Sequence, residues 1–179
     1  MFHLITGGSG SGKSAYAEEQ ILKLGEGNRV YIATMMPTDD EAKERINKHQ
    51  DRRKNMNFTT LERPFDLASL DVPEGSNVLL ECVSNLLANE MFMPGHSGIH
   101  SVNAVIDGVE HVFRHSKNLI IVTNEVFSDG VEYGNMTYLY MEFLGLINQH
   151  LGRMADEVTE VVYGVPVPVK RPDHPEISL

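Results

Sequence analysis

Short apolar runs alternate with longer amphipathic segments along this chain of 179 residues. The runs are rich in valine, isoleucine and leucine and have turn residues near their ends, which is typical of buried strands. A shorter run before Pro64 is typical of an edge strand. The strands expected from this pattern cover residues 2–6, 29–34, 58–62, 77–82 and 118–123.

Most of the longer segments between these runs carry apolar residues at the spacing of one helix face. The helices expected from them cover residues 13–24, 38–53, 83–91, 101–115 and 136–154. Gly25 stands where a C-cap glycine would end the first helix. Thr38 and Glu41 form a capping-box pattern, which predicts that the second, strongly charged helix begins at Thr38.

Buried strands that alternate with helices predict the α/β class, with a mostly parallel sheet covered by helices on both faces. Residues 157–163 and 165–169 are expected to form a C-terminal strand pair around Gly164. The chain shows no internal repeat and no interdomain linker. We therefore expect one domain over residues 1–170, followed by a tail at residues 171–179.

The formal net charge of −10 argues against a broad nucleic-acid-binding surface. The single cysteine, Cys82, cannot form an intramolecular disulfide, which is typical of a reducing compartment. No apolar run reaches the ~20 residues of a membrane span, and the first residues lack the pattern of a signal peptide. These features predict a cytoplasmic protein with no nucleic-acid partner and no membrane span.

The most specific motif follows the first expected strand, where the spacing matches G-x-x-x-x-G-K-[ST] in full. In such a P-loop, backbone N–H groups and the N-terminus of the next helix surround the phosphates of ATP or GTP. Lys13 would reach the β- and γ-phosphates, and the Ser14 hydroxyl would ligate Mg²⁺. The loop consists of Gly7, Gly8, Ser9, Gly10, Ser11, Gly12, Lys13 and Ser14.

A P-loop also needs an acid near its metal ion. Glu81, at the carboxyl end of the strand 77–82, is in the position of a Walker-B acid, and Glu125 after the strand 118–123 is the second candidate. Ligands of open α/β sheets gather at the carboxyl ends of strands, which favours a functional role for Glu81 over that of an ordinary strand-end acid.

A second group of candidate residues lies on the charged helix. Arg45, His49 and Arg53 are spaced i, i+4 and i+8, so they share one face, and Arg52 lies beside them. Guanidinium groups disfavour a protonated histidine, so His49 is expected to stay neutral near pH 7. It could attack an α-phosphate that the arginines grip, although the same spacing also occurs on solvated charged helices.

Sequence blocks along the chain point to one family. In order, they are ITGGSGSGKSAYAE, YIAT, DDEAKERINKHQDRR, FTTLE, LLECVSNLLANE, TNEV, INQHLGRMADEV and VVYGVPVPVK. With these blocks, from residue 2 to about residue 170, the chain resembles the bifunctional adenosylcobinamide kinase/adenosylcobinamide-phosphate guanylyltransferase family of cobalamin biosynthesis. The P-loop alone is unspecific, whereas R-I-x-x-H-x-x-x-R, here residues 45–53, is diagnostic.

The resemblance implies two reactions. A nucleoside triphosphate, ATP or GTP, phosphorylates the aminopropanol hydroxyl of adenosylcobinamide. GTP then loses pyrophosphate to a histidine, His49 by position, and the GMP passes to the new phosphate to give adenosylcobinamide-GDP. The family also implies a RecA-like P-loop fold, a homotrimer, Mg²⁺ as cofactor, and nucleotide contacts at the P-loop residues and at Ala33, Thr34, His49, Gln50, Asp51, Arg52, Glu62 and Glu81.

The chain departs from the family pattern at three places. Gly10 stands where the family commonly has arginine, Phe58 stands where tryptophan is usual, and residues 127–138 lack the usual proline- and arginine-containing segment. Two alternatives remain: a kinase without guanylyl transfer, and a nucleotide-binding regulatory protein. A histidine nucleophile discriminates between the classes, because a regulatory switch does not need one.

Overall fold

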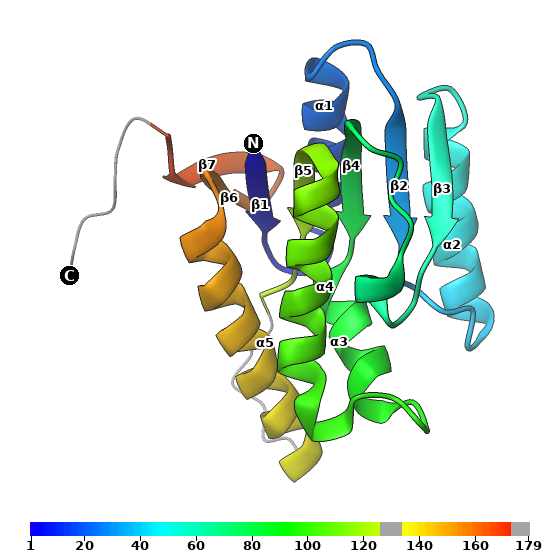
Figure 1. Cartoon of the computed structure of the whole chain (residues 1–179), viewed down its shortest axis with the longest axis vertical. Helices are drawn as coiled ribbons and strands as arrows, with labels where there is room; N and C mark the ends of the chain where they lie inside the picture. Colours follow the sequence, from blue (N-terminus) through cyan, green and yellow to red (C-terminus); the bar gives the residue numbers. More distant parts are fainter. Residues whose placement is uncertain (126–133, 173–179) are drawn as a thin grey trace.

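The computed structural model describes residues 1–125 and 134–172, and its centre is one seven-stranded sheet in the order β3-β2-β4-β5-β1-β6-β7 (Figure 1). Neighbouring strands are parallel except for the antiparallel pair β6–β7. The strands are β1 (Phe2–Thr6), β2 (Arg29–Ala33), β3 (Phe58–Glu62), β4 (Ser76–Glu81), β5 (Ser116–Val122), β6 (Glu157–Val162) and β7 (Val165–Lys170). This arrangement confirms the expected α/β class, the edge position of β3 and the C-terminal strand pair.

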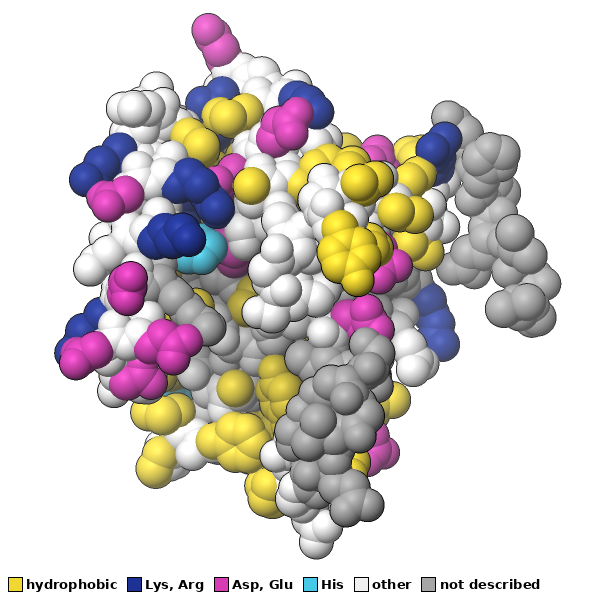
Figure 2. Space-filling view, turned by 180° about the vertical axis from the view of Figure 1, so that it is seen from behind, with side chains coloured by type: hydrophobic (Ala, Val, Ile, Leu, Met, Phe, Trp, Pro, Cys, Tyr) yellow, Lys and Arg dark blue, Asp and Glu magenta, His cyan; other side chains and the backbone are white. Residues whose placement is uncertain are grey.

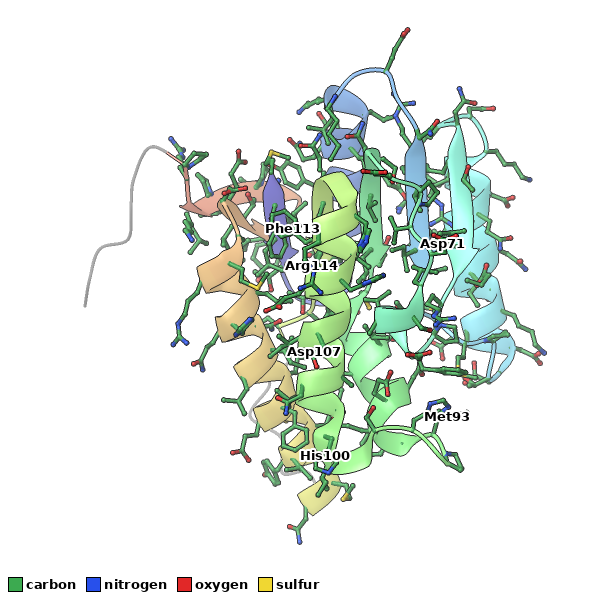
Figure 3. The ribbon with its side chains drawn as sticks, viewed as in Figure 1. Asp71, Met93, His100, Asp107, Phe113 and Arg114 are labelled. Carbon is green, nitrogen blue, oxygen red and sulfur yellow. The ribbon has the colours of Figure 1, made fainter. Side chains whose placement is uncertain are left out.

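Helices cover both faces of the sheet, as Figure 1 shows. They are α1 (Lys13–Lys23), α2 (Asp40–Arg53), α3 (Val83–Phe92), α4 (Ser101–His115) and α5 (Asn135–Met154), with short 3₁₀ turns η1 (Leu67–Ser69) and η2 (Gly98–His100). Alternate strand residues point to opposite faces, so Leu80 packs with α3, α4 and α5 whereas Leu79 packs with α1. In Figure 3, Phe113 points from α4 toward β1, where its ring centroid lies 5.5 Å from that of Phe2.

The expected start of the charged helix was wrong by about two residues. The helix α2 begins at Asp40, and Asp39 is its N-cap, with its carboxylate accepting a 2.7 Å hydrogen bond from the backbone N–H of Ala42. The Thr38 pattern was misleading because an aspartate one position later offers a charged acceptor with the same reach to the N3 amide. The other helix and strand boundaries agree with the expectations to within about two residues.

The parallel strands bring several candidate residues to one edge of the sheet. In register, Ala33 lies beside Glu62 on one side and Glu81 on the other, and Glu81 lies beside Val122. The P-loop follows β1 at the same edge. Residues 126–133 and 173–179 lie outside the described part, including much of the divergent segment and of the expected tail. Among the described residues, no helix combines the length and apolarity that crossing a bilayer requires.

Candidate nucleotide and guanylyl-transfer site

The P-loop connects β1 to α1 and is braced by the turn of the β6–β7 hairpin. The backbone N–H of Gly164 donates a 2.9 Å hydrogen bond to the Ser11 carbonyl. A Cβ on Gly7, which has a φ of 151°, would lie 2.5 Å from the Val161 carbonyl oxygen. Glycine is therefore required at this position for two reasons, the close approach of β6 and the backbone conformation.

Lys13 begins α1 and lies almost fully buried under the loop. Its Nζ donates a 2.9 Å hydrogen bond to the Gly8 carbonyl, which holds the ammonium within the loop. Burial lowers the pKa of Lys13, and the nearby Cys82 and Glu81 partly offset that effect. A desolvated ammonium at the N-terminus of a helix is a strong binding group for phosphate.

Glu81, at the end of β4, connects the P-loop to the charged helix. One carboxylate oxygen accepts a short hydrogen bond from the Ser14 hydroxyl, and the other accepts a 2.9 Å bond from the Tyr31 hydroxyl. The second oxygen also lies 3.9 Å from Nδ1 of His49. The structure thus brings together Ser14 and Glu81, the two residues expected to ligate Mg²⁺, and places the expected nucleophile beside them.

His49 is partly buried between α2 and the end of β4. Burial is the largest cause that lowers its pKa, Arg52, Arg53 and Lys48 lower it further, and Glu81 opposes them. The sequence argument predicted the direction correctly but attributed it to the arginines alone. A histidine with a lowered pKa is neutral near pH 7, and its lone pair is available for nucleophilic attack.

Arg52 is held by Glu18, a residue that the sequence argument missed. The Arg52 Nε lies 2.6 Å from one Glu18 oxygen, and Nη2 donates a 2.8 Å hydrogen bond to the other. The same Nη2 lies 3.4 Å from Nδ1 of His49. Glu18 occurs on the α1 face that also carries the buried Ala17 and Ile21, and a charge on an apolar face was the available signal.

Arg53 and Tyr31 form a second support for α2. The Arg53 guanidinium carbon lies 3.2 Å from the centroid of the Tyr31 ring, a cation–π contact. Burial raises the pKa of Tyr31 well above its usual range, so its hydroxyl stays a donor to Glu81. Arg45 falls within α2, but its side chain lies outside the described part.

Two pockets adjoin at His49 and Glu81, which line both. The first lies between the P-loop and α2 and is lined on the α2 side by Lys48 and Arg52. The second lies between α2 and the ends of β2, β3 and β4. Its lining includes Tyr31, Ala33, Ile46, Gln50, Arg53 and Glu62.

Several other candidates lie at or outside this junction. Thr34 is buried and exchanges hydrogen bonds with the backbone of Cys82, so its side chain joins β2 to β4. Asp51 lines neither pocket and pairs with Lys54 at 2.6 Å. Glu125 also lies outside both pockets, whereas Asn124, which the sequence argument did not select, lines the first.

The strand–loop–helix with its lysine, and the acid at the end of β4, define a P-loop nucleotide-binding protein of the α/β class. Two solved ATPase structures share this fold. One, described as an isolated ATPase domain, has a TM-score of 0.59 at 11% identity, covering 97% of this chain and 78% of its own. The other, an ATPase from the type III secretion system of pathogenic bacteria, has a TM-score of 0.51 at 12% identity, covering 93% and 56%.

Sequence comparison identifies the family within this class. The chain belongs to the cobinamide kinase / cobinamide phosphate guanyltransferase family, whose sequence model matches residues 3–169. It is 34% identical to the bifunctional adenosylcobalamin biosynthesis protein CobU of Escherichia coli, over 95% of this chain and 100% of that protein. The proteins CobU of Salmonella typhimurium and CobP of Pseudomonas aeruginosa are 33% and 30% identical, over 95% of this chain and 100% and 98% of theirs.

Proposed function

We propose that this protein phosphorylates adenosylcobinamide with ATP or GTP and then transfers GMP from GTP, through a covalent GMP–His49, to give adenosylcobinamide-GDP. The family supports the two activities, since its description names a cobinamide kinase and a cobinamide phosphate guanyltransferase. The observation that carries the covalent route is the position of His49, at the junction of the phosphate pocket and the pocket beside β3.

In the kinase step, the aminopropanol hydroxyl of the acceptor attacks the γ-phosphorus. A new P–O bond forms, the bond to the β–γ bridging oxygen breaks, and the nucleoside diphosphate leaves. Lys13 and the backbone N–H groups of the loop stabilise the charge on the phosphates. Ser14 and Glu81 would hold Mg²⁺ with oxygen ligands, and this ion would neutralise phosphate charge.

In the transfer step, the neutral imidazole of His49 attacks the α-phosphorus of GTP. An N–P bond forms, the bond to the α–β bridging oxygen breaks, and pyrophosphate leaves from the P-loop. A phosphate oxygen of the phosphorylated acceptor then displaces the histidine. Arg52 lies close enough to His49 to bind the transferred phosphate, and Glu18 fixes its orientation.

The second pocket suits the guanine base. Glu62 and Gln50 line it and offer carboxylate and amide groups of the kind that recognise the N1–H and amino group of guanine. The apolar lining near Ile46 and Ala33 suits the faces of the base. With the base in this pocket and the terminal phosphates on the P-loop, the α-phosphate would lie at His49.

The covalent step is tested with GTP labelled at the α-phosphate, followed by denaturation of the protein. The wild-type protein should retain label in an acid-labile, alkali-stable bond, and His49→Ala should retain none. His115→Ala, which changes an exposed histidine of α4, is the matched control and should label normally. If the wild-type protein phosphorylates cobinamide but takes up no label, it is a kinase without the covalent step. If it turns over neither substrate, it is a nucleotide-binding regulatory protein.

The P-loop is tested separately with Lys13→Ala. Removal of the buried ammonium should weaken triphosphate binding by about a hundredfold or more, as measured by calorimetry. Lys23→Ala, at the exposed end of the same helix, should leave the affinity unchanged. Unchanged affinity in Lys13→Ala would contradict this account of the loop.

We further propose that the protein acts in the cytoplasm as a homotrimer and that the β6–β7 hairpin forms the subunit contact. Val165, Val167 and Val169 are exposed on β7, and Tyr163 at the turn is 96% exposed. An exposed row of valines on an edge strand is typical of surfaces that bind another protein.

A further inference from the structure

One face of α3 connects the nucleotide pockets to an exposed apolar surface. Asn85, Asn89 and Phe92 are spaced i, i+4 and i+7, so they lie along the same face of the helix. Asn85 lines both pockets that meet at His49. Phe92 lies about 10 Å further along the helix, at 1.5 Å per residue, and is 50% exposed.

A second aromatic ring extends this surface onto α5. The ring centroid of Tyr140 lies 6.4 Å from that of Phe92. The Tyr140 hydroxyl donates a 3.1 Å hydrogen bond to the Ser84 carbonyl, so its polar end is turned into the protein. We refer to Asn85, Asn89, Phe92 and Tyr140 as the α3 shelf. Figure 2 shows hydrophobic side chains gathered on the lower part of the face that carries the basic and histidine side chains.

A groove lies between the α3 shelf and the segment that leads into α2. Met35, Met36, Asp39 and Ala42 line it on one side, and Asn85 and Asn89 line it on the other. Met35 and Asn85 also line both nucleotide pockets, so the groove is continuous with them. It therefore combines methionine side chains with amide and carboxylate groups.

We propose that the α3 shelf binds the corrin macrocycle of the acceptor, and that the groove carries its aminopropanol arm to the phosphate pocket. This inference rests on the proposed function. A macrocycle is too large to enter the pocket beside the P-loop, so only its arm reaches the γ-phosphate and His49. The aromatic rings offer the flat apolar surface that a macrocycle needs, and the amides of the groove pair with its peripheral amide groups.

Position and charge favour the shelf over the hydrophobic β6–β7 hairpin. The hairpin lies beyond β1 in the sheet, whereas Glu81 and His49 lie on the β4 side of the P-loop. The acceptor must reach both the γ-phosphate and His49, so its docking surface belongs on the β4 side. The carboxylate of Asp39 in the groove complements the positive charge of a cobalt(III) corrinoid with one alkyl ligand.

Phe92→Asp tests this inference in the full-length protein with adenosylcobinamide as substrate. The KM for adenosylcobinamide should rise about tenfold or more, because a carboxylate replaces an apolar contact surface. The rate of GMP–His49 formation and the affinity for GTP should stay unchanged. Leu22→Asp, which changes an exposed leucine of α1, is the matched control and should leave the KM for adenosylcobinamide unchanged.

A milder variant and a size measurement separate the remaining outcomes. If Phe92→Asp reduces folding, Phe92→Ala should still raise the KM for adenosylcobinamide by several-fold, and Phe92→Tyr should restore it. An unchanged KM in the folded variants would overturn the inference. So would a change in sedimentation without a change in KM, which would assign the surface to contact between copies. A wild-type protein that does not phosphorylate adenosylcobinamide would instead overturn the proposed function.

Discussion

Glu81 is the residue through which the P-loop and the charged helix meet. Its carboxylate accepts hydrogen bonds from Ser14 of the loop and from Tyr31 of β2, and it lies beside His49 of α2. A single carboxylate thus contacts both the group expected to bind the metal and the group expected to attack. This arrangement allows the same phosphate pocket to serve γ-phosphoryl transfer and attack at the α-phosphate.

The Glu18–Arg52 pair gives the first prediction at the residue scale. Glu18 is 1% exposed, and burial raises its pKa against the effect of Arg52. Glu18→Gln should lower the free energy of unfolding by about 2 kcal/mol, because Arg52 loses two charge-assisted hydrogen bonds. Urea unfolding measures the change. Glu19→Gln breaks an exposed pair with Lys23 and should change it by less than about 0.5 kcal/mol. Equal effects would show that the buried pair does not hold α2.

The pH dependence of His49 labelling gives a second prediction. The neutral imidazole is the nucleophile and its pKa is lowered, so the single-turnover labelling rate should fall to half only below pH 6.5, the ordinary value. Arg52→Gln removes one of the charges that lower this pKa, so the midpoint should move upward even if the maximal rate falls. A midpoint above pH 6.5 in the wild-type protein would contradict the burial of His49 in a basic environment.

At the scale of elements, α2 carries most of the residues that give the P-loop a reaction. Specific side-chain contacts connect it to the rest of the protein: Arg52 to Glu18, Arg53 to Tyr31, and His49 to Glu81. The sequence pattern predicted the helix and its basic face. It could not predict these partners, because Glu18 and Tyr31 belong to α1 and β2 and meet α2 only in the folded protein.

The start of α2 gives a third prediction. Asp39→Ala should lower the free energy of unfolding by about 1 kcal/mol, because the N–H of Ala42 loses its acceptor and the helix N-terminus loses a favourable charge. Thr38→Ala should have an effect of less than about 0.3 kcal/mol, since Thr38 lies outside the cap. Urea unfolding of both variants distinguishes the two caps, and a larger loss in Thr38→Ala would favour the capping box expected from the sequence.

At the scale of the whole molecule, the strand order decides which surfaces lie next to the site. The hairpin β6–β7 is far from the P-loop in sequence, yet its turn donates a hydrogen bond to Ser11. The hairpin therefore braces the loop from one side, while α2 approaches from the β4 side. An assembly formed through β7 would leave the α3 shelf on the opposite side of the P-loop available to the acceptor.

Self-association through the hairpin gives a fourth prediction. Val167→Asp should convert trimers into monomers in sedimentation experiments, because a charge would be buried in the row of exposed valines on β7. Leu146→Asp, which changes a similarly exposed leucine on α5, should leave the assembly intact. A wild-type protein that sediments as a monomer would exclude the proposed trimer and leave the site within one chain unaffected.

The sequence by itself determined the local features of this protein. Strand and helix periods gave the α/β class, and the spacing of residues 7–14 gave the P-loop, because both depend on neighbouring residues. Strand-end position also indicated Glu81 correctly. Only the tertiary structure decided how β4 lies between β2 and β5 and how His49 meets Glu81. Contacts between distant segments depend on strand order and side-chain packing, which leave no periodic signal along the chain. Glu18, Tyr31 and the α3 shelf therefore became visible only once the chain was folded.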